Sequence, residues 1–350
     1  MKSESMCPMA TIAAKLLNDN QRLSLIDHAG NIARRAIGKQ PIVNDYLFWP
    51  KGLLALGLSE FFDYASSAES ILADDLTDTS DNVLAGLQTY FDKWLGKGAL
   101  VRKIDDAVAG KALIRLYRIT GDERYLRGIE AIYNFLTCLP SDIGGAIEYQ
   151  STGCVFADGA GQSAMFLSEY SRLTGDIRAY ELGLRQIRRY LDMALDSKTM
   201  LPYHAYRCSD STFQCEKLGI VGWGRAVGWL LMGASQYPEL INLVTPFFEF
   251  AIECQRDDGL IPWCLLASEG PADTSATAMI MYAAIESGYA NGLFLSKAEH
   301  GLMESVDERG RVQRSQAECV GIGLYPQKYG HFSFGQGVTL AALSRGQSVG

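Results

Sequence analysis

The sequence predicts an all-α protein, an (α/α)6 barrel in which six helical hairpins are arranged in a ring. Three observations predict it: a helix-start motif that recurs every 50 to 65 residues, a helix–turn–helix segment that occurs twice, and a shortage of alternating strand patterns. These repeats fill nearly the whole chain of 350 residues. We therefore expect one domain over residues 1–350, with about the first 20 residues forming a peripheral or flexible segment.

The duplicated segment spans residues 116–122 and returns, 54 residues later, as residues 170–176. Each copy ends one run of apolar residues at helical spacing and begins another. Glycine stops the first helix and the following aspartate caps the second, which indicates a tight turn between two helices. The helices predicted on this basis cover residues 107–119, 124–136, 160–173 and 177–195.

The helix-start motif places a polar or aromatic residue before small residues and an apolar helix. It occurs at Trp49, Asp105, Asp158, Trp223, Asp273 and Phe334. Such an array forms either an open solenoid or a closed toroid. The terminal units are as rich in glycine and aromatic residues as the central ones, which favours closure. Residues 143–156 and 200–206 are expected to form short hairpins on long loops.

The charge balance and the distribution of cysteines exclude several classes of protein. With 32 Lys and Arg against 40 Asp and Glu, the chain has a net charge of −8, which argues against nucleic-acid binding. No apolar stretch is long enough to span a membrane, and the N-terminus lacks a signal-peptide pattern, so we expect a cytoplasmic protein. The eight cysteines show no metal-ligand spacing, and we expect reduced thiols and no metal site. Cys208 and Cys215 can face each other across a loop, but a disulfide or metal role is disfavoured.

In a closed ring, the first residues of successive inner helices lie at one end of the barrel. The acidic and aromatic residues of the helix-start motif would therefore surround one mouth. A concave surface lined by aromatic rings and carboxylates is typical of a sugar-binding site.

Three carboxylates are candidates for chemistry at this mouth. Asp158 lies between apolar and small residues at a helix start, where burial favours its protonated form and the helix dipole favours the ionised one. It is either a general acid or an ordinary helix cap. Asp105 and Asp106 form a doublet one repeat earlier, so one of them can cap the helix while the other faces the mouth. The alternative is a solvated acidic turn.

The remaining candidates are cationic or aromatic and would bind the substrate. Arg225 lies in an apolar run and needs an acidic partner, either Asp105 or Asp158 or a carboxylate of the substrate. Trp223 and Trp229 are six residues apart, so one of them can stack on a sugar while the other belongs to the core. Trp49 begins the first repeat, and His204 and His331 lie in aromatic surroundings near predicted loops. Hydrogen-bonded surface histidines are the alternative for the last two.

The ordered set of motifs resembles glycoside hydrolase family 105, the unsaturated rhamnogalacturonyl hydrolases, which are related to the unsaturated glucuronyl hydrolases of family 88. The resemblance rests on residues 104–125, 156–176, 203–204, 223–229 and 274–278. It departs from the family at Gly159-Ala160-Gly161, where we expect the small residues to open space beside the substrate.

The resemblance implies an (α/α)6 barrel that acts on oligosaccharides with an anionic terminal sugar, the C4=C5 unsaturated uronic acid left by polysaccharide lyases. Asp158 would protonate C4, water would add at C5, and the hemiketal would open to release the neighbouring sugar. Asp105 would hold sugar hydroxyls or assist Asp158, and His204, Trp223 and Arg225 would bind the sugar. No cofactor is implied, and we expect a monomer or a homodimer.

Two other functions remain open at this point. One is a different enzyme on the same toroid, either an inverting glycosidase or a sugar epimerase or isomerase. An epimerase would need His204 and His331 to face each other across the mouth. The other is a non-catalytic protein of polysaccharide binding or biosynthesis.

Overall fold

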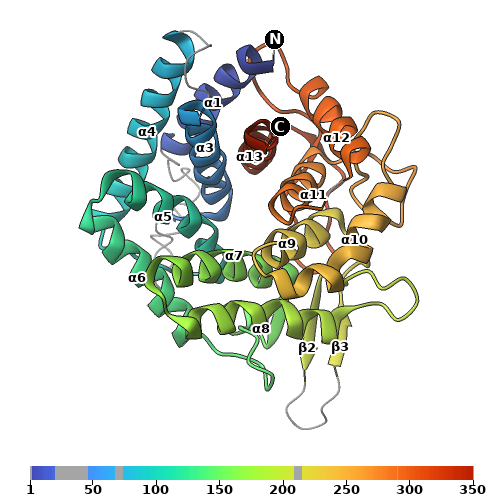
Figure 1. The fold of residues 1–350 in the computed structure, drawn as a ribbon. Helices are drawn as coiled ribbons and strands as arrows, with labels where there is room; N and C mark the ends of the chain where they lie inside the picture. Colours follow the sequence, from blue (N-terminus) through green and yellow to red (C-terminus); the bar gives the residue numbers. More distant parts are fainter. Residues whose placement is uncertain (1, 20–45, 68–73, 209–214, 290, 350) are drawn as a thin grey trace, which may run out of the picture.

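The computed structural model describes residues 2–19, 46–67, 74–208, 215–289 and 291–349. Within them, six helices form an inner ring, seen along its axis in Figure 1. They are α3 (Trp49–Ser67), α5 (Val108–Thr120), α7 (Ala157–Thr174), α9 (Gly224–Ala234), α11 (Thr274–Glu286) and α13 (Ser333–Val349). The last of them packs against the first, so the ring is closed and the predicted (α/α)6 barrel is confirmed.

A second set of helices lies outside this ring (Figure 1). It comprises α1 (Lys2–Asn18), α4 (Asp74–Leu95), α6 (Glu123–Cys138), α8 (Ile177–Ala194), α10 (Ile241–Glu253) and α12 (Gly292–Glu304). Most of the N-terminal segment that we expected to be peripheral or flexible forms the outer helix α1, in which Met9, Ala13 and Leu17 are fully buried. This helix contacts α3, α4 and α13 and so covers the junction where the ring closes.

The turns between paired helices follow the chemistry that the sequence predicts. Gly121 and Gly175 end α5 and α7 in the left-handed conformation, with φ of 66° and 76°. This conformation is strained for residues with a side chain and easy for glycine. Asp122 and Asp176 then cap the next helix by accepting a hydrogen bond from a backbone N–H two residues on.

Burial patterns separate the inner helices from the outer ones. The inner helix α7 is buried at nearly every position from 157 to 170, whereas α8 buries residues only along one stripe. Close packing explains the glycines after Asp158. A Cβ atom at Gly161 would lie 2.2 Å from the carbonyl oxygen of Trp229 in α9, so this glycine brings two inner helices together. The sequence led us to expect that these small residues open space beside the substrate. Gly161 instead lies against the backbone of Trp229, so that expectation is wrong here.

Short strands lie on the loops at one end of the ring. β1 (Cys154–Phe156), β2 (Ala205–Cys208) and β3 (Cys215–Leu218) form an antiparallel sheet in that order. β4 (Ser315–Gln316) pairs with β5 (Tyr329–Gly330). The expected hairpin over 143–156 is wrong in extent: the segment has an isolated bridge and the 3-10 turn η2 (Tyr149–Ser151) before β1, and β1 pairs with β2, far along the chain.

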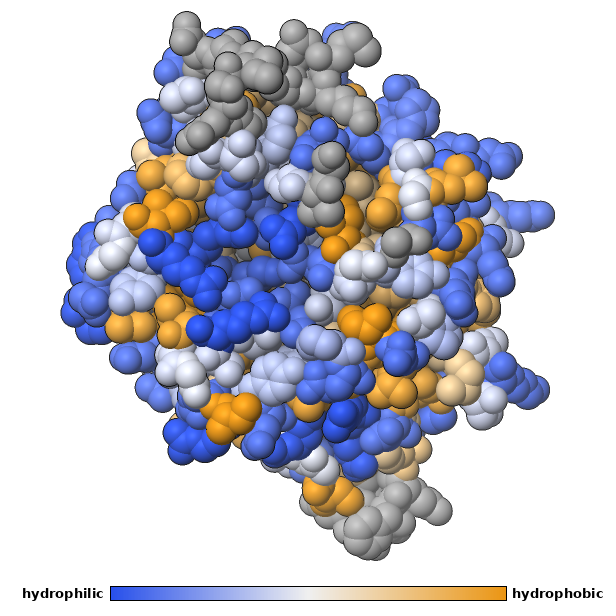
Figure 2. Space-filling view, in the orientation of Figure 1, coloured by the Kyte–Doolittle hydropathy of each residue, from blue (hydrophilic) through white to orange (hydrophobic). Residues whose placement is uncertain are grey.

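The surface of the ring is polar across its middle in the view of Figure 2, with hydrophobic residues in small, separate patches. Large apolar side chains that are exposed, such as Leu293 and Val320, are scattered over the chain. Among the described residues, no helix is both long and apolar enough to cross a bilayer.

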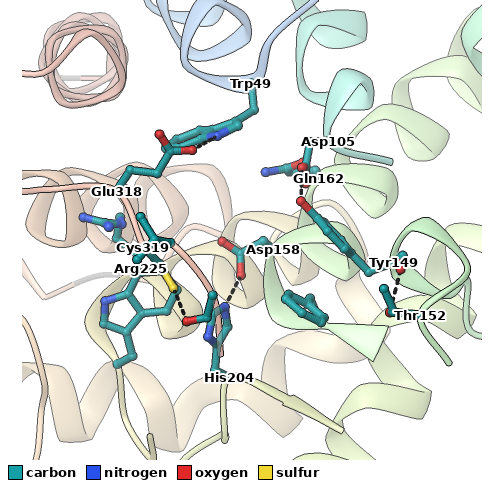
Figure 3. Close-up of a pocket in the computed structure, with 14 residues that line it drawn as sticks. Trp49, Asp105, Tyr149, Thr152, Asp158, Gln162, His204, Arg225, Glu318 and Cys319 are labelled. Carbon is teal, nitrogen blue, oxygen red and sulfur yellow. Dashed lines mark hydrogen bonds and ion pairs between the residues drawn. The ribbon is translucent and has the colours of Figure 1, made fainter. Parts of the chain in front are cut away.

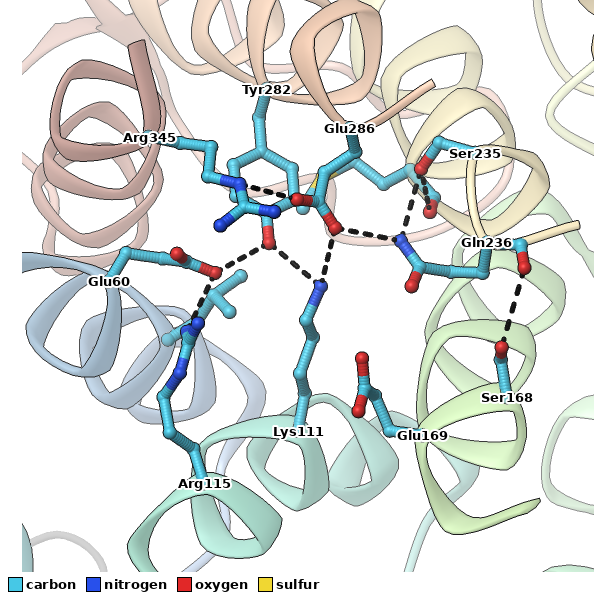
Figure 4. Close-up of polar contacts among 12 residues, drawn as sticks. Glu60, Lys111, Arg115, Ser168, Glu169, Ser235, Gln236, Tyr282, Glu286 and Arg345 are labelled. Atoms are coloured by element: carbon cyan, nitrogen blue, oxygen red, sulfur yellow. Dashed lines mark hydrogen bonds and ion pairs between the residues drawn. The ribbon is translucent and has the colours of Figure 1, made fainter. Parts of the chain in front are cut away.

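Inside the ring, a network of charged side chains joins the inner helices (Figure 4). Lys111 lies 3.0 Å from Glu286 and donates to the Tyr282 hydroxyl, which donates to Glu60. Arg345 also contacts Glu286, with 2.6 Å between nitrogen and oxygen. Burial alone would raise the pKa of Glu286, but Lys111 and Arg345 outweigh it and lower this pKa to about 2.

Replacing Glu286 with Gln should therefore destabilise the protein at neutral pH, by about 2–3 kcal/mol. A carboxylate whose pKa is lowered by folding stabilises the native state above its unfolded pKa. That contribution is lost as the pH falls through the folded pKa. The difference in thermal unfolding temperature between wild type and Glu286→Gln should thus be large at pH 7 and smaller at pH 3. Glu304→Gln, at an exposed position that ends α12, is the control and should change little at either pH. If the difference in unfolding temperature between wild type and Glu286→Gln does not depend on pH, the ionised carboxylate of Glu286 is not what stabilises the network.

Candidate active site

A cavity of about 270 Å³ lies where the inner helices begin (Figure 3). Its walls combine carboxylates with aromatic rings, as expected for one mouth of the barrel. The lining residues are Trp49, Asp105, Tyr149, Thr152, Phe156, Asp158, Gln162, His204, Trp223, Arg225, Glu318, Cys319, Val320 and Gly321.

Six of the nine site residues that the sequence indicates meet in this cavity. They are Trp49, Asp105, Asp158, His204, Trp223 and Arg225. Five of these residues lie at the starts of α3, α5, α7 and α9. Asp105 is counted with α5 because it lies in the 3-10 turn η1 (Ile104–Ala107) just before that helix. His204 is the residue immediately before β2.

The other three candidates lie outside the cavity lining. Asp106 accepts hydrogen bonds from the backbone nitrogens of Arg102 and Lys103, so it caps the turn that carries Asp105. Trp229 is a core residue whose ring meets that of Trp49 edge-on. His331 bonds through Nδ1 to the carbonyl oxygen of Val312. The candidates thus divide into those that line the cavity and those that do not. Asp105, Trp223 and His204 line it, whereas Asp106, Trp229 and His331 do not.

Asp158 and His204 form a hydrogen-bonded pair inside the cavity. Asp158 lies in the first turn of α7 but is not its N-cap residue, a position that Phe156 occupies. Its Oδ2 lies 3.1 Å from His204 Nε2, and His204 Nδ1 lies 2.9 Å from the hydroxyl of Tyr325. Burial lowers the pKa of His204, but hydrogen bonding to Asp158 and Cys319 outweighs this effect and raises the pKa to about 9. At neutral pH His204 is therefore protonated.

Asp105 is held beside this pair by two polar neighbours. The Tyr149 hydroxyl donates to its Oδ2 at 2.5 Å, and the Gln162 amide nitrogen, turned toward it, donates to Oδ1 at 3.1 Å. Burial raises the pKa of Asp105 to about 7, the bond from Tyr149 opposes the rise, and the charge of Asp158 adds to it. Asp105 is therefore divided between its two protonation states near neutral pH and can both accept from and donate to sugar hydroxyls.

Arg225 fixes the loop that forms the opposite wall. Its guanidinium donates to the carbonyl oxygens of Gln316 and Ala317, both at 2.8 Å, and lies 3.4 Å from Asp273. The guanidinium stacks 4.8 Å from the ring of Trp223. The acidic partner within the protein is thus Asp273, and the expected pairing with Asp105 or Asp158 is wrong. A contact with a substrate carboxylate stays a prediction.

Sequence reasoning missed the rest of the cavity wall. Phe156 and Gln162 flank Asp158 in its motif, and this proximity was an available signal. Tyr149 lies in the segment for which we expected a hairpin. Glu318 and its neighbours lie in a loop with no periodic pattern, and only folding brings them to Trp49. Within the described residues, no group of three or more His, Cys, Asp or Glu side chains is placed to hold a metal ion.

Cys208 and Cys215 are directly opposite each other in the β2–β3 hairpin. Their sulfur atoms lie 2.9 Å apart, and both are free thiols. The sequence-based expectation that they can face each other is confirmed. Burial is the largest cause that raises the pKa of Cys215, to about 12, so this thiol is protonated at neutral pH.

The ring of helical hairpins, with paired carboxylates and aromatic rings at one mouth, defines a toroidal glycoside hydrolase. The chain belongs to Glycosyl Hydrolase Family 88, whose family model matches residues 31–345. It is 26% identical to the unsaturated rhamnogalacturonyl hydrolase YesR of Bacillus subtilis (strain 168) over 325 residues, which cover 87% of each chain. The resemblance seen in the sequence is confirmed.

Several solved structures share the fold, among them the following two. A possible member of the GH105 family from Salmonella enterica serovar Paratyphi A matches with a TM-score of 0.78 and 15% identity, covering 100% of this chain and 95% of that one. The unsaturated glucuronyl hydrolase of Bacillus sp. GL1, responsible for the degradation of glycosaminoglycan, matches with a TM-score of 0.69 and 14% identity. That match covers 98% of this chain and 96% of the other.

Proposed function

We propose that this protein removes the unsaturated uronic acid from the end of lyase-generated oligosaccharides by adding water to its C4=C5 double bond. The observation that carries the proposal is the contact between Asp158 and a protonated His204, beside Asp105 in an acidic, aromatic cavity. Membership of the family and the similarity to an unsaturated rhamnogalacturonyl hydrolase support it.

The first step would be protonation of the enol ether. A proton from the His204 imidazolium passes through the Asp158 carboxyl to C4, which leaves positive charge shared between C5 and the ring oxygen. The carboxylate of Asp158, freed of its proton, stabilises that charge in a cavity where solvent screening is weak. A general acid of this kind contributes about 10²–10⁴ to the rate.

Water would then complete the reaction. It adds to C5 and gives its proton to Asp158, which restores the pair. The resulting hemiketal opens to a ketone, and the hemiacetal left at C1 expels the neighbouring sugar as an alcohol. Asp105 would hold the sugar hydroxyls, while Trp49, Trp223 and Phe156 provide aromatic faces for the ring.

The position of His331 argues against the epimerase alternative. Two bases on opposite sides of a sugar are needed for that reaction, and His204 with His331 was the pair available. His331 lies outside the cavity lining, bonded to a backbone carbonyl. His204 is instead committed to Asp158 and Tyr325.

A panel of unsaturated disaccharides tests the proposal, because the ultraviolet absorbance of the conjugated double bond disappears on hydration. We expect the wild-type protein to abolish this absorbance for at least one member and to release one equivalent of the second sugar. The matched saturated disaccharides should remain intact. Release of sugar from saturated glycosides with no loss of absorbance would overturn the proposal in favour of conventional glycoside hydrolysis.

We also propose a cytoplasmic location. All eight cysteines are free thiols, which is the state maintained in a reducing compartment. Labelling of intact and permeabilised cells with a thiol reagent that does not cross membranes would test it, since only permeabilised cells should allow labelling of the exposed Cys138.

A further inference from the structure

The rim of the cavity carries one carboxylate that the proposed chemistry does not use. Glu318 is exposed, and its Oε1 accepts a hydrogen bond from Trp49 Nε1 at 2.9 Å (Figure 3). Asp105, His204 and Arg225 lie deeper, with 5%, 3% and 2% of their surfaces exposed. Glu318 therefore stands at the opening of the cavity, outside the groups that would handle the reacting sugar.

The backbone that carries Glu318 is fixed from below. Arg225 holds the carbonyl oxygens of the two preceding residues, and the nitrogen of Gln316 donates to Asp273 at 3.1 Å. Trp49 fixes the side chain at its other end. A carboxylate held by a rigid backbone and a tryptophan keeps its place when a ligand arrives, so its charge can act on the ligand with little reorganisation.

Among the described residues, the cavity lining places no cation beside Glu318 at the rim. Among the described residues that line the cavity, the cationic side chains are Arg225 and His204. Both lie deep, and each already faces a carboxylate, Asp273 and Asp158 respectively. The lining residues near the opening, such as Thr152, Val320 and Gly321, are uncharged. An anionic group at the rim would meet the charge of Glu318 with no described lining cation beside it.

We propose that Glu318 determines specificity for the second sugar of the substrate and selects an uncharged one. The inference rests on the proposed function, which places the terminal uronic acid beside Asp158 and leaves the next sugar at the opening. Hydroxyl groups of a neutral sugar would donate to the Glu318 carboxylate. A sulfate or carboxylate on that sugar would be repelled, because two like charges a few ångströms apart at a partly solvated site weaken binding by about tenfold.

The test uses pairs of unsaturated disaccharides that differ in the charge of the second sugar. One pair has a hexosamine with and without a sulfate, and the other has a neutral deoxyhexose or a hexuronic acid. For the wild type, kcat/KM should favour the neutral member by about tenfold. Glu318→Gln should reduce this preference several-fold, chiefly by lowering KM for the charged member, and Glu318→Lys should reverse it. Glu304→Gln, at an exposed position outside the cavity lining, should keep the wild-type ratio.

The outcomes separate this inference from the function on which it rests. If unsaturated disaccharides are hydrolysed but Glu318→Gln leaves the ratio unchanged, the specificity role is wrong and the proposed function stands. The same holds if the wild type prefers the charged member. If no variant removes the absorbance of any disaccharide, the proposed function itself fails and the inference fails with it. Raising the salt concentration should narrow the wild-type preference and leave that of Glu318→Gln unaffected, a response that a merely structural role of Glu318 would not produce.

Discussion

Replacing Asp158 with Asn should lower kcat/KM for unsaturated disaccharides by about a thousandfold or more. Asparagine has the size of aspartate and keeps an oxygen that can accept from His204 Nε2, which lies 3.1 Å from the carboxylate in the wild type. It cannot carry a proton to C4 or take one from water. We therefore expect kcat to fall while the dissociation constant for the substrate changes only a few-fold, measured by single-turnover kinetics and by calorimetric titration of the inactive variant.

Asp106→Asn is the control for the same substitution at an aspartate outside the cavity lining, one residue after Asp105. Its carboxylate caps a turn outside the cavity lining, and an asparagine oxygen can take over that role. Activity should stay within a few-fold of wild type. Equal losses in both variants would mean that Asp158 acts through the fold and not as the acid. So would an Asp158→Asn variant that keeps more than a tenth of wild-type activity.

The pH dependence of kcat/KM further distinguishes a role of Asp158 as the acid from a role in the fold. The wild-type pair loses its proton as the pH rises through the pKa of His204, about 9, so kcat/KM should fall above that pH. Residual activity of Asp158→Asn should lack this limb, because no proton is then delivered through the pair.

The fold was predictable because its signals are local and repeated. A glycine that ends one helix and an aspartate that caps the next act within a few residues, and both copies of the turn keep the predicted geometry. The ring follows once six such units are counted. The extent of the strands was not predictable in the same way, because β1 pairs with β2 across some 50 residues of intervening chain.

The candidate site was predictable only in part, for a related reason. Asp158 and Trp223 lie at helix starts, and the repeat itself places helix starts at one mouth. Which of Asp105 and Asp106 faces the cavity depends on the 3-10 turn that holds them, which the sequence did not indicate. The contact between Trp49 and Glu318 joins residues 269 positions apart, and only ring closure creates it.

Ring closure itself gives the second large prediction: replacing Gly337 with Ala should lower the free energy of unfolding by about 3 kcal/mol. Gly337 lies in α13 against α3, and a Cβ atom there would lie 2.4 Å from the carbonyl carbon and oxygen of Leu53. Backbone atoms cannot rotate aside as a flexible side chain can, so the two helices must separate. Thermal and urea unfolding measure the loss.

Gly86→Ala is the control for the same substitution without a clash. A Cβ atom at Gly86, in α4, would meet its nearest neighbours at 3.4 and 3.6 Å, which is ordinary contact. Alanine also favours a helix over glycine by about 0.5–1 kcal/mol, so this variant should be as stable as wild type or more stable. If both variants unfold at the wild-type temperature, the contact between α3 and α13 does not limit stability.

The opposite side of the contact offers an independent check on the mechanism. A Cβ atom at Gly57 in α3 would lie 2.2 Å from the carbonyl oxygen of Gly337, so Gly57→Ala should separate the same two helices. Once one substitution has forced them apart, the second finds part of its space already open. The double variant should therefore be less destabilised than the sum of the single ones, which is the expected sign for two residues that share one contact.

The same helix contact also bears on activity. Trp49 and Phe334, in the first turns of α3 and α13, have ring centroids 4.9 Å apart, and Trp49 lines the cavity, so activity should fall together with stability. Strict additivity with intact activity would show that each glycine acts within its own helix, and the seam between the first and last hairpins would then not be what shapes the active site.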